Sequence, residues 1–337
     1  MKAIGFKKSL DILEQESFIE FEMEKGKPFG RDLLVKIEAT SVNPVDFKIR
    51  QNAAKGSVLE IPKVIGWDAV GKIVEIGEKV TNFKVGDAVF YAGDLTRTGS
   101  NTEYQLVDER IVGHKPKNIS NAAAAAMPLT TLTAYESIFD RIKVDADKDK
   151  GKSILILAGA GGVGSIAIQL AKQLTGLVVI ATASRKESID WCHELGADYV
   201  VNHRNLKEEL KAIDHDEVDY ILDFVDLEGY WETIGDIIKP QGHIVSITGS
   251  SVPLNLDILK SKSVSFSWEF MYTRSMFSTR DMERQSDILN HVSKLLDEGI
   301  LKSTATTVLK GFSVENVKKS HQLQESGKSI GKTVIEY

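Results

Sequence analysis

Residues 153–164 read SILILAGAGGVG, and this stretch decides the fold of the chain. The apolar run Ile154 to Ala158 passes directly into glycines, and apolar residues then recur at helical spacing from Ala167. A second apolar run, Leu177 to Thr182, follows that helix and completes a βαβ unit with its glycines at the first turn. The pattern predicts a dinucleotide-binding fold, in which phosphates lie at the helix N-terminus among free N–H groups. The alternative is a glycine-rich turn with a purely structural role.

The end of the second predicted strand indicates which dinucleotide is bound. Sites for NAD usually carry an acidic residue there, about 20 residues after the glycines, which accepts from the ribose 2′-OH. This chain has Ser184, Arg185 and Lys186 instead. A hydroxyl and a guanidinium can bind a 2′-phosphate that a carboxylate would repel, so the sequence favours NADP(H). Alternatively, Arg185 and Lys186 are ordinary solvated charges at the start of a helix that runs to Leu195.

Composition places the chain among ordinary globular proteins. It has 337 residues, 42% of them hydrophobic and 27% charged, which is enough for two domains with separate cores. A net charge of −6 offers no basic field for nucleic acid or an anionic membrane. No apolar window approaches the roughly 18 residues of a membrane span, and the first residues lack a signal-peptide pattern, so we expect a cytoplasmic protein. The single cysteine, Cys192, fits a reducing compartment and a place in a helix core.

Predicted strands lie on both sides of the βαβ unit and indicate two domains. Before residue 120, short β-branched segments broken by glycine turns predict a compact barrel or sandwich: Leu33 to Ala39, Val64 to Gly66, Ala69 to Ile76 and Asp87 to Ala92. Six buried strands follow from Ile154, the number that a doubly wound fold needs: Ile154 to Ala158, Leu177 to Thr182, Tyr199 to Val201, Val218 to Phe224, His243 to Thr248 and Ser263 to Trp268. Helical patterns cover residues 122–140 and 288–296, and a last strand covers Lys332 to Glu336. The nucleotide-binding domain, residues 124–268, therefore interrupts a domain made of residues 1–123 and 269–337.

Several further motifs, spread over nearly the whole length, give the chain a family resemblance. They are SVNPVD at residues 41–46, GWDAVG at 66–71, FKVGD at 83–87, PLTTLTAY at 128–135, the glycine loop and Gly331-Lys332. Together they resemble the medium-chain dehydrogenase/reductases and, within them, the zinc-free quinone oxidoreductase-like branch. The chain also looks close to a subgroup labelled zinc-type alcohol dehydrogenase-like. The resemblance implies an α/β protein with a GroES-like, β-rich catalytic domain, an inserted Rossmann domain with a doubly wound parallel sheet, and an active-site cleft between them.

The residues that match the zinc ligands of this family are not zinc ligands here. In zinc members a cysteine matches Asn43, a histidine matches Trp67, and a further cysteine or acid lies near Leu129. Zinc favours thiolate and imidazole, and Asn43 and Trp67 supply neither. Asp46 and Asp68 remain as possible oxygen ligands, although such a pair more often forms hydrogen bonds or a salt bridge. We therefore expect no bound metal.

Without a metal, the developing oxyanion of a substrate must be stabilised by hydrogen-bond donors. The candidates are the backbone from Asn43 to Asp46 and the hydroxyls of Thr130 and Tyr91. Reduction of a simple aldehyde concentrates charge on one oxygen and benefits most from a Lewis acid. A quinone or an α,β-unsaturated ketone delocalises that charge, so this substrate class suits the site better.

The family pattern assigns further roles, each with a simpler alternative. It places Asn43 and Asp46 near the nicotinamide and substrate, but Asn43 is equally suited to cap a turn and Asp46 to orient the backbone. Thr133 would lie against the nicotinamide, or its hydroxyl would bond to the helix backbone. Trp67 is either a wall of the substrate pocket or a core aromatic, and His203 is either near the adenosine phosphate or a solvated loop residue.

The candidate residues fall into two groups. Thr248 and Gly249 follow a strand at the carboxyl edge of the sheet, where they would line the nicotinamide pocket. The candidate cofactor-binding residues are Gly159, Gly161, Gly162, Val163, Gly164, Ser184, Arg185, Lys186, His203, Thr133, Thr248, Gly249 and Lys332. The candidate catalytic residues are Asn43, Asp46, Thr130, Tyr91 and Trp67.

The sequence as a whole favours an NADPH-dependent reductase that transfers hydride to a small-molecule quinone or α,β-unsaturated carbonyl, and we expect it to be a homodimer. Two alternatives stay open. One is a zinc-type alcohol dehydrogenase. The other is an NADPH-binding sensor or structural module with little turnover, because the cofactor motif is strong whereas no single catalytic residue stands out.

Overall fold

The computed structural model describes residues 1–337, which form two compact units. Residues 1–129 and 272–337 make up the first unit, and residues 130–271 make up the second, so the second is inserted into the first. The boundaries expected from sequence fall a few residues earlier in both places. At the first boundary the reason is helix α2 (Asn121–Ala125), which packs against strands of the first unit.

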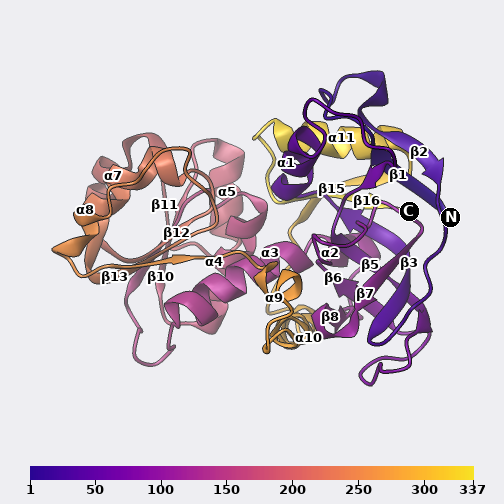
Figure 1. Ribbon diagram of the computed structural model, residues 1–337. Coiled ribbons are helices and arrows are strands. Elements are labelled where there is room, and N and C mark those ends of the chain that lie inside the picture. Colours follow the sequence, from indigo (N-terminus) through magenta and orange to yellow (C-terminus); the bar gives the residue numbers. More distant parts are fainter. The chain divides into compact units, whose positions relative to one another are not determined.

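The second unit is built on a six-stranded parallel sheet, as predicted (Figure 1). The strand order is β11-β10-β9-β12-β13-β14, which reverses direction at β9 as in a doubly wound fold. The predicted strands are confirmed with ends that differ by a few residues, except β13, which begins five residues before the predicted start, at Ile238 rather than His243. The strands are β9 (Ser153–Ile156), β10 (Val178–Thr182), β11 (Tyr199–Val201), β12 (Val218–Asp223), β13 (Ile238–Ser246) and β14 (Ser265–Trp268).

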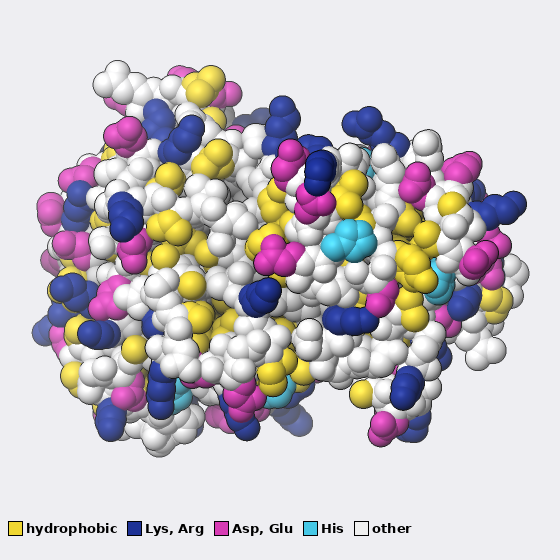
Figure 2. All heavy atoms as spheres, turned by 180° about the vertical axis from the view of Figure 1, so that it is seen from behind, with side chains coloured by type: hydrophobic (Ala, Val, Ile, Leu, Met, Phe, Trp, Pro, Cys, Tyr) yellow, Lys and Arg dark blue, Asp and Glu magenta, His cyan; other side chains and the backbone are white.

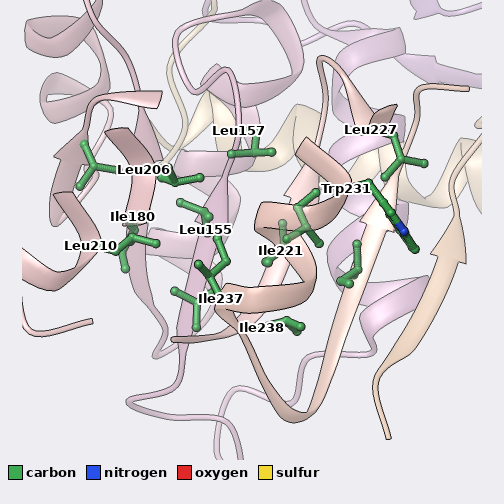
Figure 3. Packing of buried hydrophobic residues seen from close by; sticks show 14 of the residues in the cluster. Leu155, Leu157, Ile180, Leu206, Leu210, Ile221, Leu227, Trp231, Ile237 and Ile238 are labelled. Atoms are coloured by element: carbon green, nitrogen blue, oxygen red, sulfur yellow. The ribbon is translucent and has the colours of Figure 1, made fainter. Parts of the chain in front are cut away.

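Helices connect these strands and cover the sheet. Right-handed crossovers that run to opposite sides of β9 place α4 and α5 on one face and α6 to α8 on the other. On the latter face Leu155 and Ile221 of the strands pack with Trp231 and Ile237 of α7 (Figure 3). The helical segments are α3 (Pro128–Tyr135), η3 (Glu136–Ile142), α4 (Gly162–Leu174), α5 (Lys186–Glu194), η4 (His203–Asn205), α6 (Leu206–Ala212), α7 (Leu227–Ile237) and α8 (Asp257–Lys260).

Two sheets form the first unit, and its last strand returns to its early ones. β16 (Lys332–Glu336) pairs antiparallel with β3 (Asp32–Ser41), with Val334 opposite Ser41. The larger sheet has the order β15-β16-β3-β5-β6-β8, with β7 also paired to β3, and the smaller has the order β2-β1-β4. The remaining strands are β1 (Lys2–Phe6), β2 (Ile19–Glu22), β4 (Lys63–Val64), β5 (Asp68–Ile76), β6 (Ala88–Tyr91), β7 (Tyr104–Asp108), β8 (Val112–His114) and β15 (Ala305–Lys310). The helical segments are η1 (Gln15–Ser17), α1 (Pro44–Asn52), η2 (Glu109–Ile111), α2, α9 (Thr273–Met276), α10 (Arg284–Asp297) and α11 (Val314–Glu325).

The helical segment predicted over residues 122–140 is three segments instead of one. α2 ends at Ala125, and α3 begins at Pro128, where a proline is tolerated because the first turn needs no N–H partner. The chain then continues as the π-helix η3, which ends at Ile142 and is followed by the C-cap residue Lys143 with a φ of 63°. The amphipathic helix predicted over residues 288–296 is confirmed within α10.

The surface carries charges of both signs, and the single cysteine is buried, as the composition led us to expect. No helix is both long and apolar enough to cross a membrane. Basic and acidic side chains are interspersed on the face shown in Figure 2. Cys192 is fully buried in α5, and burial raises the pKa of its thiol to about 12, as expected of a core residue.

Candidate functional site

The glycine loop joins β9 to α4 through tight backbone contacts. Ala158 has a φ of 58°, and its N–H donates to Thr182 Oγ1 at 2.9 Å. The Gly159 N–H donates to the Thr182 carbonyl oxygen at 3.0 Å, which ties the loop to the end of β10. Gly161 is the N-cap of α4, and no side chain caps the helix, so its first N–H groups are free to bind an anion.

The glycines of this loop differ in what a side chain would meet. A Cβ at Gly164 would lie 2.7 Å from Gly159 Cα and closer still to the Ala158 carbonyl oxygen. A Cβ at Gly159 would lie 2.7 Å from Ala181 Cβ. At Gly161 only the Ala158 oxygen would come within 4 Å, at 3.3 Å. Gly159 and Gly164 are thus needed for packing, whereas Gly161 leaves open space at the helix N-terminus, as a bound pyrophosphate requires.

The residues predicted to bind the 2′-phosphate lie at the end of β10. Ser184 is half-buried, and Arg185 and Lys186 are exposed where α5 begins. Lys186 forms an ion pair with Asp190 at 2.6 Å, one turn further along the helix. Both residues stay candidates for the 2′-phosphate, and Arg185 has the guanidinium that can bind a phosphate in a bidentate manner. His203 is half-buried at the start of η4, after β11.

A buried carboxylate that the sequence analysis did not single out fixes the ends of β12 and β13. Asp223 Oδ2 accepts from the Ser246 and Thr248 hydroxyls, both at 2.6 Å. Thr248 Oγ1 in turn accepts from the Leu227 N–H at 2.9 Å. Gly249 is exposed, and a Cβ there would meet nothing within 4 Å. The hydrogen bonds to Asp223 thus fix the backbone up to Thr248, and the next residue, Gly249, leaves open space. This arrangement is compatible with the predicted nicotinamide pocket.

In the first unit, segments that are far apart in sequence form a buried polar cluster. We call it the Lys332 cluster: Ser41, Asn43, Asp46, Asp68 and Lys332, each at most 3% exposed. The Lys332 ammonium donates to the Val42 carbonyl oxygen at 2.7 Å and to Asn43 Oδ1, and it lies 3.4 Å from Asp68 Oδ2. These contacts hold Lys332 within the first unit, and a contact between Lys332 and the cofactor stays a prediction.

Asp68 is the hydrogen-bond acceptor at the centre of this cluster. Its Oδ2 accepts from Ser41 Oγ at 2.7 Å and from Asn43 Nδ2 at 2.8 Å, and its Oδ1 accepts from the Leu129 N–H at 2.8 Å. The hydrogen-bonded, salt-bridged arrangement considered for this carboxylate is therefore the one that the structure shows.

Asp46 differs from Asp68 in having an unsatisfied oxygen. It occupies the third position of α1, where Oδ2 accepts from the Asn43 N–H at 2.5 Å, while Oδ1 has no hydrogen-bond partner. Burial raises the pKa of the Asp46 carboxyl to about 7, against the lowering effects of the Asn43 N–H and the Lys332 charge. Burial also lowers the pKa of Lys332, and the Asp68 and Asp46 carboxyls oppose this shift. Asn43 is the N-cap residue of α1 and contacts Lys332 and Asp68, while its expected place near the nicotinamide and substrate stays a prediction.

The residues present do not fit a zinc ion. The structure holds no group of three or more histidine, cysteine, aspartate or glutamate side chains that could bind a metal. Asp68 is already satisfied by four donors, and one of them is the Lys332 ammonium, whose charge would repel a divalent cation. Asn43 Oδ1 is likewise used by Lys332.

The other catalytic candidates are buried. Trp67 is 1% exposed, donates from Nε1 to the Asp94 carbonyl oxygen at 3.1 Å, and contacts the Tyr272 ring edge-on, with centroids 6.3 Å apart. Tyr91 is fully buried at the end of β6, and its hydroxyl has no hydrogen-bond partner. Thr130 and Thr133 are 2% and 4% exposed on α3.

Comparison with known proteins identifies the family. The family model described as "Alcohol dehydrogenase GroES-like domain" matches residues 30–119, and "Zinc-binding dehydrogenase" matches residues 162–286. The chain is 44% identical over 338 residues to a zinc-type alcohol dehydrogenase-like protein of Staphylococcus epidermidis, covering 99% of both chains. The chain belongs to the medium-chain dehydrogenase/reductase superfamily. It is therefore an oxidoreductase of a family that binds a nicotinamide cofactor and small-molecule substrates, as the sequence motifs predicted.

Other relatives of this medium-chain dehydrogenase/reductase differ in their described reactions. A Rhizobium etli structure, provisionally described as a zinc-dependent alcohol dehydrogenase, is 44% identical with a TM-score of 0.94, covering 100% of this chain and 98% of the other. The 2-methylene-furan-3-one reductase of Solanum lycopersicum is 33% identical over 97% of this chain and 76% of its own length. The Escherichia coli quinone oxidoreductase, solved with NADPH, is 25% identical with a TM-score of 0.83 over the full length of both chains.

Proposed function

We propose that this protein is an NADPH-dependent reductase that transfers hydride to a quinone or an α,β-unsaturated carbonyl without zinc. The observation that carries the proposal is the Lys332 cluster. Its ammonium is bonded to Asn43, the residue that matches a zinc ligand of the metal-dependent members, and it lies 3.4 Å from Asp68. The likeness to a furanone reductase and to an NADPH-bound quinone oxidoreductase supports the same reaction class.

The site residues suit an acceptor that delocalises negative charge. Bound NADPH supplies the hydride. We assign Tyr91 of the first unit and Thr130 of the second as hydroxyl donors to the acceptor oxygen, and Trp67 as an aromatic wall of the substrate pocket. Asn43 holds Lys332 and Asp68 in place. Asp46, whose carboxyl has a pKa raised to about 7 by burial, holds a proton near neutral pH and would donate it to the reduced acceptor.

The preference for NADPH rests on the end of β10. Arg185 is exposed where α5 begins, and the half-buried Ser184 precedes it with a hydroxyl that could bond to a phosphate oxygen. A guanidinium can bind a 2′-phosphate in a bidentate manner. No carboxylate occupies these positions.

The decisive experiment is an acceptor panel. Quinones, enones and saturated aldehydes are offered with NADPH to untagged protein, before and after treatment with a chelator, and metal content is measured in parallel. We expect oxidation of NADPH by quinones or enones, no stoichiometric zinc, and no loss of rate on chelation. Stoichiometric zinc with chelator-sensitive activity would favour the alternative that this protein is a zinc-type alcohol dehydrogenase. NADPH binding without any turnover would favour the alternative that this protein is an NADPH-binding sensor or structural module.

Substitution of the proposed donor Thr130, and of Asn43, which positions Lys332 and Asp68, separates catalysis from cofactor binding. Asn43→Ala or Thr130→Val should lower kcat about tenfold to a few hundredfold with little change in NADPH affinity. Thr131→Val is the matched control on the same helix, because the Thr131 hydroxyl has no hydrogen-bond partner to lose. Equal kcat values for Thr130→Val and Thr131→Val would show that the Thr130 hydroxyl does not donate to the acceptor.

We also propose that the protein is a homodimer joined at β14. This strand is an edge of the six-stranded sheet, and its last residue, Trp268, is 54% exposed. An open edge beside an exposed aromatic ring favours pairing with a second copy. Light scattering should give twice the mass of one chain, and Trp268→Lys should shift the mass toward that of one chain. A wild-type protein with the mass of a single chain would contradict the proposal.

A further inference from the structure

A small cavity lies beside the Lys332 cluster in the first unit. It offers about 10 Å³ to the centre of a water molecule and is bounded by β3, α1, β16 and α11. Its lining includes Ser41, Asp46, Asn101 and His321. A space of this size holds about one water, provided that two to four polar groups bind it.

Two of the lining side chains carry buried polar atoms without hydrogen bonds. Asp46 is 1% exposed and leaves Oδ1 unsatisfied, and His321 is 2% exposed and leaves Nδ1 unsatisfied. A buried polar atom without a hydrogen bond destabilises the folded protein, so one water that bonds to both side chains would stabilise it. The cavity therefore has both the volume and the partners that a bound water needs.

His321 also connects this cavity to the surface. Its Nδ1 lies 3.9 Å from Glu325 Oε1, one turn further along α11. Glu325 is 19% exposed and accepts from Arg50 of α1 at 2.7 Å. Burial and the Arg50 charge lower the pKa of the imidazole to about 3, so the ring is neutral at physiological pH. The nitrogen near Glu325 is also the one without a hydrogen bond, so an imidazole whose Nδ1 carries no proton can accept one there from Glu325 and then release it from the same nitrogen to a water.

We propose that this cavity binds one water molecule which, together with His321, carries protons from Glu325 at the surface to Asp46. This inference rests on the proposed reductase function, in which Asp46 gives up one proton at each turnover. Asp46 then regains a proton from the water, the water from the imidazole, and the imidazole from Glu325, which takes one from solvent. No electrons move along this path. The other charged groups beside it are Lys332 and Asp68 at the Asp46 end and Arg50 at the Glu325 end.

The rate at which Asp46 becomes protonated tests the path without any turnover. After a rapid drop in pH, time-resolved infrared spectroscopy follows the carboxylic acid band, and Asp46→Asn identifies which band belongs to Asp46. We expect His321→Gln and His321→Phe to slow protonation by at least about tenfold, while Asp46 still becomes fully protonated. Ser320→Ala is the control, because it changes the cavity wall but keeps both Asp46 and His321. Glutamine retains polar groups, so His321→Gln decides the question if the phenylalanine variant does not fold.

A second readout uses chemical rescue. His321→Ala should reduce acceptor more slowly, and added imidazole should restore the rate, whereas pyrrole, which has the same shape but cannot relay a proton, should not. Protonation of Asp46 at the wild-type rate in both His321→Gln and His321→Phe would overturn the path. A protein that reduces no acceptor would overturn the reductase proposal instead, and the infrared measurement would still decide whether protons reach Asp46 through His321.

Discussion

The glycine loop and the Lys332 cluster are two sites built in opposite ways. Residues 158–164 are consecutive, and their site consists of free N–H groups and of space that side chains leave open. The Lys332 cluster consists of charged and polar side chains from distant segments, and Lys332 and Asp68 are 264 positions apart. The loop should therefore be sensitive to added volume and the cluster to removed charge. Three substitution experiments test this contrast, and a fourth tests the choice of the cofactor that the loop would bind.

The largest effect is expected at the centre of the cluster. Asp68→Asn keeps the shape of the side chain but removes the charge beside the Lys332 ammonium, which is 2% exposed. Removing one partner of a buried ion pair typically costs about 3–5 kcal/mol, because the other charge remains buried without compensation. Urea unfolding measures the loss. Adding Lys332→Met to the variant should recover part of it, and a loss below about 1 kcal/mol would show that the pair is not important for stability.

The second effect depends on pH. The pKa of Asp46 is raised from 3.8 to about 7, so between these values the folded protein holds a proton that the unfolded chain has released. The stability that this proton provides is complete below pH 4 and is lost as pH rises through 7. Relative to Asp46→Asn, the wild type should therefore lose roughly 4 kcal/mol over this range. Unfolding of both proteins across the range tests this, and a difference that does not change with pH would contradict it.

A pair of glycine substitutions tests the loop. Gly164→Ala places a Cβ against the backbone of Ala158 and Gly159, and we expect a loss of about 3 kcal/mol in unfolding free energy. Gly161→Ala meets only one atom within 4 Å and should leave stability nearly unchanged. It should nevertheless weaken NADPH binding at least about tenfold, because the methyl group enters the space for the pyrophosphate. Similar stability losses in both variants would break the distinction between packing and binding glycines.

The smallest effect concerns cofactor choice. Arg185→Ala should remove about 1.5–3 kcal/mol of the preference for NADPH over NADH. Lys186→Ala should change it less, because an ammonium cannot form the bidentate hydrogen bonds that a guanidinium makes with a phosphate. Titration of both cofactors against the three proteins measures these differences. Equal affinity of the wild type for NADPH and NADH would make the assignment of Arg185 wrong.

Sequence reasoning predicted the local features well and the distant ones poorly. All six strands of the parallel sheet and the glycine loop were predictable, because each is encoded within a few consecutive residues. β1, β7 and α1 were not predicted, since these short segments show no clear apolar period by themselves.

The site followed the same division. Asn43 and Asp46 were singled out as candidates through the family motif, and a hydrogen-bonded or salt-bridged Asp68 was considered. That Lys332 is its ionic partner depends on the pairing of β16 with β3, which no local pattern encodes. Asp223 was missed for the same reason: its importance comes from Ser246 and Thr248, more than 20 positions later. His321 carried no signal, because a lone histidine in an amphipathic helix looks like any other.

The insertion of one unit into the other sets an order of events on the ribosome. Residues 130–271 contain every strand of the parallel sheet, so this unit can fold while the rest of the chain is still being synthesised. The first unit must wait, because β3 pairs with β16, which is among the last segments to emerge. Until then Asp68 lacks the ammonium of Lys332, and the nascent chain carries an open strand edge. We expect chaperones to bind residues 1–129, the part of the first unit that is synthesised before β16.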